Sequence, residues 1–109
     1  MNFKKKINLS VDKVDSAILK GIYDGIEEIC SIVEADAVLN VHVDTGELKK
    51  SISYEVEQDK KSTTGTVGSN MEYAIWEDLR HPYLSYAVDK NLGSFDSIMQ
   101  KNIKQKVGE

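Results

Sequence analysis

Across residues 43–52, VDTGELKKSI, the chain changes from the hydrophobic period of a helix to that of a strand. Apolar residues recur every three or four positions before this segment and alternate with polar residues directly after it. A further apolar pattern of helical period closes the chain. This order predicts an α+β fold, with a long N-terminal helix, a small, mostly antiparallel sheet of three to four strands, and a C-terminal helix. We expect the sheet to carry both long helices on one face.

A long apolar stripe predicts the N-terminal helix. Ile26 and Ile32 lie on its flanks, and its members follow the three-and-four spacing of one helix face: Val11, Val14, Ile18, Ile22, Ile29 and Val33. Ser10 can cap the start of this helix, and the stripe weakens at Asp36, so we expect the helix to end between Asp36 and Asn40. Gly21 and Gly25 lie at the edge of the stripe. Because a glycine inside a helix costs about 1 kcal/mol relative to alanine, both predict close approach of another backbone.

The segment where the period changes has the chemistry of a capped helical turn. Asp44 and Glu47 have the spacing of a capping box, in which each side chain accepts the other residue's amide hydrogen. Gly46 lets the backbone pass close to a neighbour, and Leu48 is expected to point inward. From Ser51 onward the residues alternate as in a strand. We therefore predict a structural role for Asp44, with a metal or partner contact as the alternative.

The sheet is predicted from two alternating segments and one short apolar segment. Residues 51–57 alternate cleanly, residues 58–62 are polar and predict a hairpin loop, and residues 63–69 form a second strand rich in threonine. Residues 73–76, YAIW, form either a third strand or a turn of helix packed on the sheet. In that segment Tyr73 and Trp76 are expected to lie in the core.

The only proline predicts the start of the C-terminal helix. Pro82 suits the first position of a helix, where its missing amide hydrogen has no consequence. Helical spacing then continues over Leu84, Val88, Leu92, Phe95, Met99 and Ile103. Gly93 interrupts this helix without breaking the register, and Ser94 could instead cap a separate last helix.

Composition limits the chain to one ordinary globular domain. It has 109 residues with a net charge of -4, and we expect a single domain with its core at about 11–104. The acidic balance disfavours nucleic-acid binding, and the basic run Lys4–Lys6 is expected to be a frayed, solubilising tail. Cys30, the only cysteine, excludes an internal disulfide and is expected to be a small buried hydrophobe. With no membrane-length apolar run and no signal-peptide stretch, the sequence predicts an intracellular protein, or one released by lysis.

The spacing of reactive residues predicts neither a catalytic site nor a metal site. His42 and His81 lie outside any metal-ligand spacing with cysteine or carboxylates. Glu72, Glu77 and Asp78 form an acidic cluster, which we expect to be a solvated edge or an interface rim rather than a metal or acid–base centre. No cofactor is predicted.

The order of these segments resembles the tail-completion, or head–tail joining, proteins of long-tailed bacteriophages. Their Asp-Thr-Gly-x-Leu-x-x-Ser motif is matched by Asp44, Thr45, Gly46, Leu48 and Ser51. Their Tyr-Ala followed by Glu is matched by Tyr73, Ala74 and Glu77. Their Pro-aromatic-Leu and later alanine are matched by Pro82, Tyr83, Leu84 and Ala87. The resemblance covers roughly residues 11–104, and it is the order of the motifs, more than any one of them, that is specific.

The chain departs from the family pattern at two loops. Val43 stands where the family often has proline, and Glu77 is followed by Asp78, Leu79 and Arg80 rather than soon by glycine. The loop before Pro82 is also short. These departures concern local loop geometry and leave the order of elements unchanged.

The resemblance implies a structural virion protein, not an enzyme. Such a protein is made in the host cytoplasm and forms a ring in the phage neck, through which DNA can pass. Its partners would be copies of itself, the head connector or adaptor, and tail-tube or tail-terminator proteins. No membrane and no sequence-specific nucleic acid are implied.

Charged segments suggest where neighbouring subunits of such a ring would meet. We expect Lys60 and Lys61 on the hairpin to face the acidic segment containing Glu72, Glu77 and Asp78 on the next subunit. Two alternative functions stay open: a small metal-dependent hydrolase using the three carboxylates, and a cytosolic toxin, antitoxin or regulator of similar α+β build.

Overall fold

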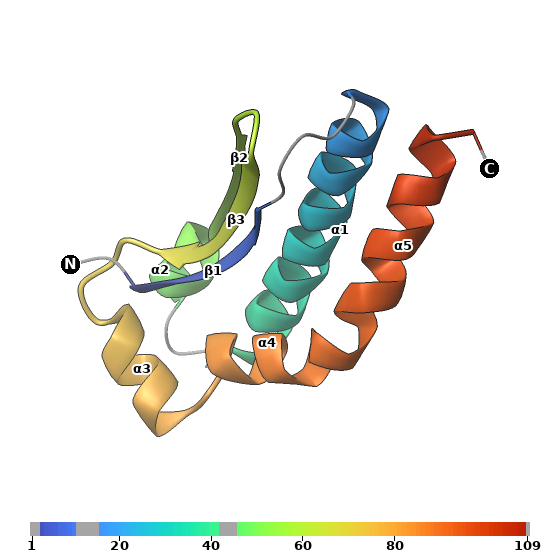
Figure 1. Ribbon diagram of the computed structural model, residues 1–109. Coiled ribbons are helices and arrows are strands. Elements are labelled where there is room, and N and C mark those ends of the chain that lie inside the picture. Colours follow the sequence, from blue (N-terminus) through green and yellow to red (C-terminus); the bar gives the residue numbers. More distant parts are fainter. Residues whose placement is uncertain (1–2, 11–15, 42–45, 109) are drawn as a thin grey trace.

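The computed structural model describes residues 3–10, 16–41 and 46–108. Figure 1 shows the elements, which follow one another as β1 (Phe3–Ser10), α1 (Ser16–Asn40), α2 (Gly46–Ser51), β2 (Ser53–Gln58), β3 (Ser62–Ser69), α3 (Ala74–Arg80), α4 (Leu84–Asn91), the short 3-10 helix η1 (Leu92–Ser94) and α5 (Phe95–Lys106). The α+β class is confirmed, with a long N-terminal helix, an antiparallel sheet and C-terminal helices.

The N-terminal residues form a strand instead of a frayed tail. In the three-stranded sheet the order is β1-β3-β2, and both edge strands are antiparallel to β3. Phe3, Ile7 and Leu9 pack against the core while Lys4 and Lys6 point outward. The prediction of a solubilising tail is therefore wrong, because the lysines form the polar half of an alternating strand. Residues 73–76 supply no strand and lead into α3.

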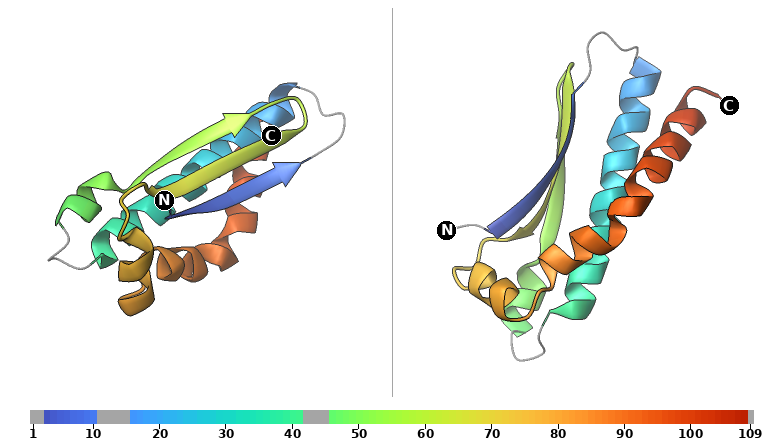
Figure 2. Two further views of the ribbon diagram at one scale, coloured as in Figure 1. Left: turned by 90° about the vertical axis from the view of Figure 1, so that its left-hand side faces the viewer. Right: turned by 60° about the horizontal axis from the view of Figure 1, so that its bottom comes forward.

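One helix, α1, covers one face of the sheet, and α5 packs on the far side of α1 (Figures 1 and 2). A Cβ atom on Gly65 of β3 would overlap the side chains of Cys30 and Ile26, so α1 lies directly against β3. A Cβ atom on Gly21 would lie 2.6 Å from the Cα of Ile103, which confirms the close backbone approach predicted there. Gly25 instead faces the Met99 side chain. The expectation that both long helices lie on the sheet is wrong for α5.

Acidic residues of α1 bind the C-terminal helices along their seam. Asn91 of α4 donates from Nδ2 to Oδ2 of Asp36 over 2.7 Å. Glu28 accepts from Asn102 Nδ2 over 2.9 Å and lies 2.9 Å from Lys101 Nζ. These bonds explain why Asp36 interrupts the apolar stripe, and α1 ends at Asn40, within the predicted interval.

The boundaries of the helices differ from the predictions at both ends of the chain. Ser10 belongs to β1, so it does not cap α1, and the predicted helix start at Val11 lies outside the described residues. Pro82 precedes the first residue of α4, Leu84, by two positions and is not its first residue. The described part of the chain contains no helix with the length and hydropathy needed to cross a membrane.

The C-terminal helical pattern is divided into two helices. Leu92–Ser94 forms the 3-10 helix that contains Gly93, and α5 begins at Phe95. The alternative of a separate last helix is therefore correct. Ser94 occupies the N-cap position but makes no side-chain cap hydrogen bond.

Candidate functional site

The short helix α2 is bound to the end of the sheet. Leu48 is fully buried, as predicted, and the Ser51 hydroxyl donates to the Leu48 carbonyl over 2.7 Å. Ser51 ends α2 instead of beginning the strand, and its Oγ lies 2.6 Å from Oγ of Ser69, the last residue of β3. A Cβ atom on Gly46 would meet nothing within 4 Å among the described residues, so none of them makes the close approach predicted there.

The structural role of Asp44 at the start of the DTG motif stays a prediction. Asp44 and Thr45 lie outside the described residues, and with them the proposed capping box. Its other member, Glu47, is exposed in the first turn of α2.

Asp78 caps helix α4 from within the protein. Its Oδ1 atom accepts hydrogen bonds from the amides of Tyr83, Leu84 and Ser85, at 3.1, 2.9 and 3.1 Å, and its Oδ2 atom accepts from the Ser85 hydroxyl. Only 6% of the residue is exposed. Burial alone would raise the pKa of this carboxyl, but the hydrogen bonds from Ser85, Tyr83 and Leu84 outweigh burial and lower it.

The other residues of the Pro-Tyr-Leu motif support the same corner. Tyr83 is buried, and its hydroxyl donates to the Ala74 carbonyl in α3 over 3.0 Å. Burial, reinforced by the carboxylates of Asp78 and Glu77, raises the pKa of the Tyr83 hydroxyl well above its ordinary value, so it stays a donor. Leu84 is fully buried as well. The motif therefore fixes α3 against α4.

Glu77 is also turned inward, with 5% of the residue exposed. Its Oε1 atom lies 3.9 Å from Arg80 Nη2, and its Oε2 atom is buried without a hydrogen-bond partner among the described residues. The expectation of a solvated acidic rim is thus wrong for Glu77 and Asp78, because both carboxylates face the interior. Neither presents a surface charge that could meet Lys60 or Lys61 of a neighbouring subunit.

The inward turn of these carboxylates exposes the apolar face of α3. Trp76 is 63% exposed and Leu79 is 67% exposed, and together with Ile75 and Glu72 they line a shallow apolar hollow. We call these four residues the α3 patch. Tyr73, at the helix N-cap, is 37% exposed, so the prediction that Tyr73 and Trp76 lie in the core is wrong. A helical wheel over residues 74–80 separates the two faces, but only the contact with α4 shows that the acidic face is the buried one.

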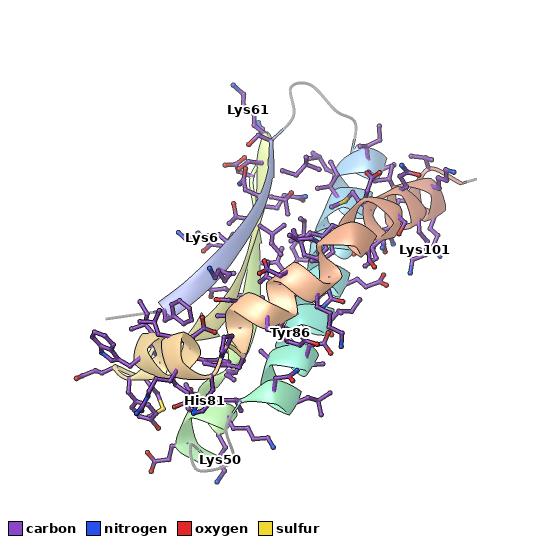
Figure 3. All side chains as sticks on the ribbon, turned by 90° about the horizontal axis from the view of Figure 1, so that it is seen from below. Lys6, Lys50, Lys61, His81, Tyr86 and Lys101 are labelled. Atoms are coloured by element: carbon purple, nitrogen blue, oxygen red, sulfur yellow. The ribbon has the colours of Figure 1, made fainter. Side chains whose placement is uncertain are left out.

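The hairpin between β2 and β3 presents the predicted lysines at the opposite end of the sheet from α3 (Figure 1). Asp59 accepts at Oδ1 from the amides of Lys61 and Ser62, both over 2.8 Å, which closes the turn. Lys60 and Lys61 are exposed, and Figure 3 shows Lys61 at the tip. Glu72 is exposed too. The sheet separates these lysines from Glu72, so they form two distant surfaces of one subunit.

The described residues contain no group of three or more His, Cys, Asp or Glu side chains placed to hold a metal ion. The Asp78 oxygens hold the N-terminus of α4, so this carboxylate does not support the hydrolase alternative. Cys30 is fully buried, as predicted, and burial, reinforced by the charges of Glu27 and Glu34, raises the pKa of its thiol to about 11. A thiol in that state is a poor nucleophile.

Comparison with protein families identifies a bacteriophage family. A family model described as "Bacteriophage HK97-gp10, putative tail-component" matches residues 5–77, more than half of the chain. The matched range runs from β1 to the middle of α3 and includes Trp76. No curated protein and no solved structure gave a significant match.

Proposed function

Because the chain belongs to the HK97-gp10-like family of bacteriophage tail components, we propose that it is a neck protein whose ring joins the capsid to the tail. A tail component is a structural part of the virion, and the proposed role would put this one at the head–tail junction. The ring would contact the head connector or adaptor on one side and tail-tube or tail-terminator proteins on the other. DNA would pass through it without sequence-specific contacts.

The α3 patch is the observation that most favours a structural binding role over an enzymatic one. A tryptophan and a leucine that line one hollow, each more than half exposed, give an apolar surface of the kind that can bind a partner protein. Tryptophan is also the residue type that most often anchors a protein interface. We assign this patch to the contact with a neighbouring virion protein.

The position of the hairpin supports two separate contacts. A protein inserted between head and tail needs a surface for each neighbour, and the hairpin tip and α3 lie at opposite ends of the sheet (Figure 1). Lys60 and Lys61 give the tip a positive charge, whereas the α3 patch is apolar with Glu72 at its edge. The two ends therefore suit partners of different chemistry. We keep Lys60, Lys61 and Glu72 as candidate interface residues.

Family membership favours this role over a cytosolic toxin, antitoxin or regulator. The test is complementation of a phage from which the gene has been deleted. Without the protein, we expect electron micrographs to show DNA-filled heads and complete tails that remain separate, and supplying the protein should restore joined particles. Joined, infectious virions in its absence would contradict the proposal, and so would a block at an earlier step that leaves no finished tails.

A further inference from the structure

Both outer strands of the sheet have an unpaired edge within the described part of the chain. The order β1-β3-β2 makes β1 and β2 the edge strands. In an edge strand, every second residue points its N–H and C=O groups away from the sheet, where another strand can bind them. The left view of Figure 2 shows α1 and α5 behind the sheet, and among the described residues no helix or strand covers the other face or the long edges of the sheet.

The bare face carries opposite charges at its two edges. Lys4 and Lys6 point outward from β1, and Glu55 and Glu57 point outward from β2. Between them, β3 contributes small side chains, and the register places Lys6 opposite Thr66, which is in turn opposite Glu55. One edge of the face is therefore basic and the other is acidic. The same residues line the shallow hollows on this face.

We propose that β1 of one subunit pairs with β2 of the next copy, so that the sheet continues from subunit to subunit. This inference rests on the proposed ring and names the contact that closes it. Both edge strands are antiparallel to β3, so they run in the same direction. A copy placed beside the first in the same orientation would therefore form a parallel β2–β1 pair, with strands about 5 Å apart.

The charges favour this pairing over a two-fold dimer. Pairing two β2 edges would put Glu55 and Glu57 against the same glutamates, and pairing two β1 edges would put Lys4 and Lys6 against lysines. Like charges on neighbouring strands are destabilising, whereas opposite charges attract. The β2–β1 contact is heterologous, since it joins different surfaces of the two copies. Repetition of such a contact produces a ring when the rotation closes.

Edge charges have another common role, because lysines and glutamates on edge strands prevent unwanted strand pairing. The two roles predict different results when the charges are exchanged. A protective charge works with either sign, so reversal would be harmless. A pairing charge requires the opposite sign on its partner, so reversal at one edge would be harmful and reversal at both edges would restore the contact.

The experiment uses three edge variants of the full chain in the complementation assay. The first carries Lys4→Glu with Lys6→Glu, the second carries Glu55→Lys with Glu57→Lys, and the third carries all four changes. A matched control, Lys20→Glu with Lys104→Glu, makes the same change in net charge as the first variant at exposed positions on α1 and α5. Melting temperatures establish that each variant folds and that its monomer is as stable as the wild type.

We expect the first two variants to fold normally and to lose head–tail joining, while the four-fold variant and the control join as the wild type does. Normal joining by either single-edge variant would overturn the proposal. The proposal would also be overturned if the four-fold variant folded but did not join heads to tails, or if the control variant lost joining. It would likewise be overturned if a loss of monomer stability explained the joining defect of the first two variants. Failure of the wild-type protein to restore joining would instead contradict the proposed function.

Discussion

Gly21 of α1 lies directly against the backbone of Ile103 in α5, where a Cβ atom would come within 2.6 Å of the Ile103 Cα. Gly21→Ala should therefore lower stability, although alanine is the better helix former by about 1 kcal/mol. Overpacking at this contact would force α5 away from α1, at a cost of about 1–3 kcal/mol. Urea unfolding followed by circular dichroism measures the difference.

Gly93→Ala is the control for this substitution. A Cβ atom at Gly93 would meet nothing within 4 Å among the described residues. Alanine should raise the unfolding free energy there by roughly 0.4–1 kcal/mol, because it restricts the unfolded chain. If Gly21→Ala stabilised the protein as much as Gly93→Ala, the α1–α5 contact described above would be wrong.

Removal of the Asp78 carboxylate should destabilise the corner between α3 and α4. Asp78→Ala leaves three amides at the start of α4 without their acceptor. A lost cap typically costs ~0.5–2 kcal/mol, and the burial of these donors adds to that. Asp78→Asn should lose less, since its amide oxygen can still accept. Equal melting temperatures for the wild type and Asp78→Ala would contradict the capping role.

The same carboxylate should make stability depend on acid pH. Its pKa in the folded protein is lowered below that of the unfolded chain, which is about 3.9. Its contribution is therefore complete above the unfolded pKa and is lost as the pH falls through the folded pKa. The difference in melting temperature between wild type and Asp78→Asn should be constant from pH 7 to about pH 5 and then shrink below about pH 4. A difference that grows in acid would oppose this assignment.

The α3 patch should matter for assembly and not for folding. Trp76→Ser combined with Leu79→Ser removes the exposed apolar surface, so we expect loss of head–tail joining with little change in melting temperature. Leu39→Ser is the control, because Leu39 is 78% exposed and belongs to a different helix, α1. Normal joining by the double variant, or an equal defect in the control, would remove the patch from the interface.

Cys30 should be unreactive in the folded protein. With a thiol pKa of about 11, only about one molecule in a thousand carries a thiolate at pH 8, and the sulfur is fully buried. An aromatic disulfide reagent should therefore label Cys30 slowly in native buffer and rapidly in concentrated urea. Rapid labelling under native conditions would show that α1 separates from the sheet, because Cys30 lies against Gly65 of β3.

The spacing of apolar residues in the sequence predicted those helices and strands in which the apolar side chains are also the buried ones. The apolar stripe of α1 and the alternation of Tyr54 and Val56 in β2 belong to this group. β1 was missed because the run Lys4–Lys6 hides the alternation of Phe3, Ile7 and Leu9. Its partner, β3, lies more than fifty residues away, and only that pairing makes the segment a strand.

The orientation of α3 could not be predicted, because it depends on a contact with a later segment. Its Glu77 and Asp78 face inward since Asp78 is needed at the start of α4, and Trp76 is left outside as a result. From residues 74–80 alone, burial of the aromatic face is the simpler expectation. Residues that break such an expectation often mark a binding surface.

Electron cryomicroscopy of the intact virion would test the neck assignment. We predict a ring of copies of this chain at the junction of head and tail, with the α3 patch covered by another virion protein and β1 of each copy beside β2 of the next. Density for the chain elsewhere in the tail, or no repeated copies at the junction, would contradict the neck assignment.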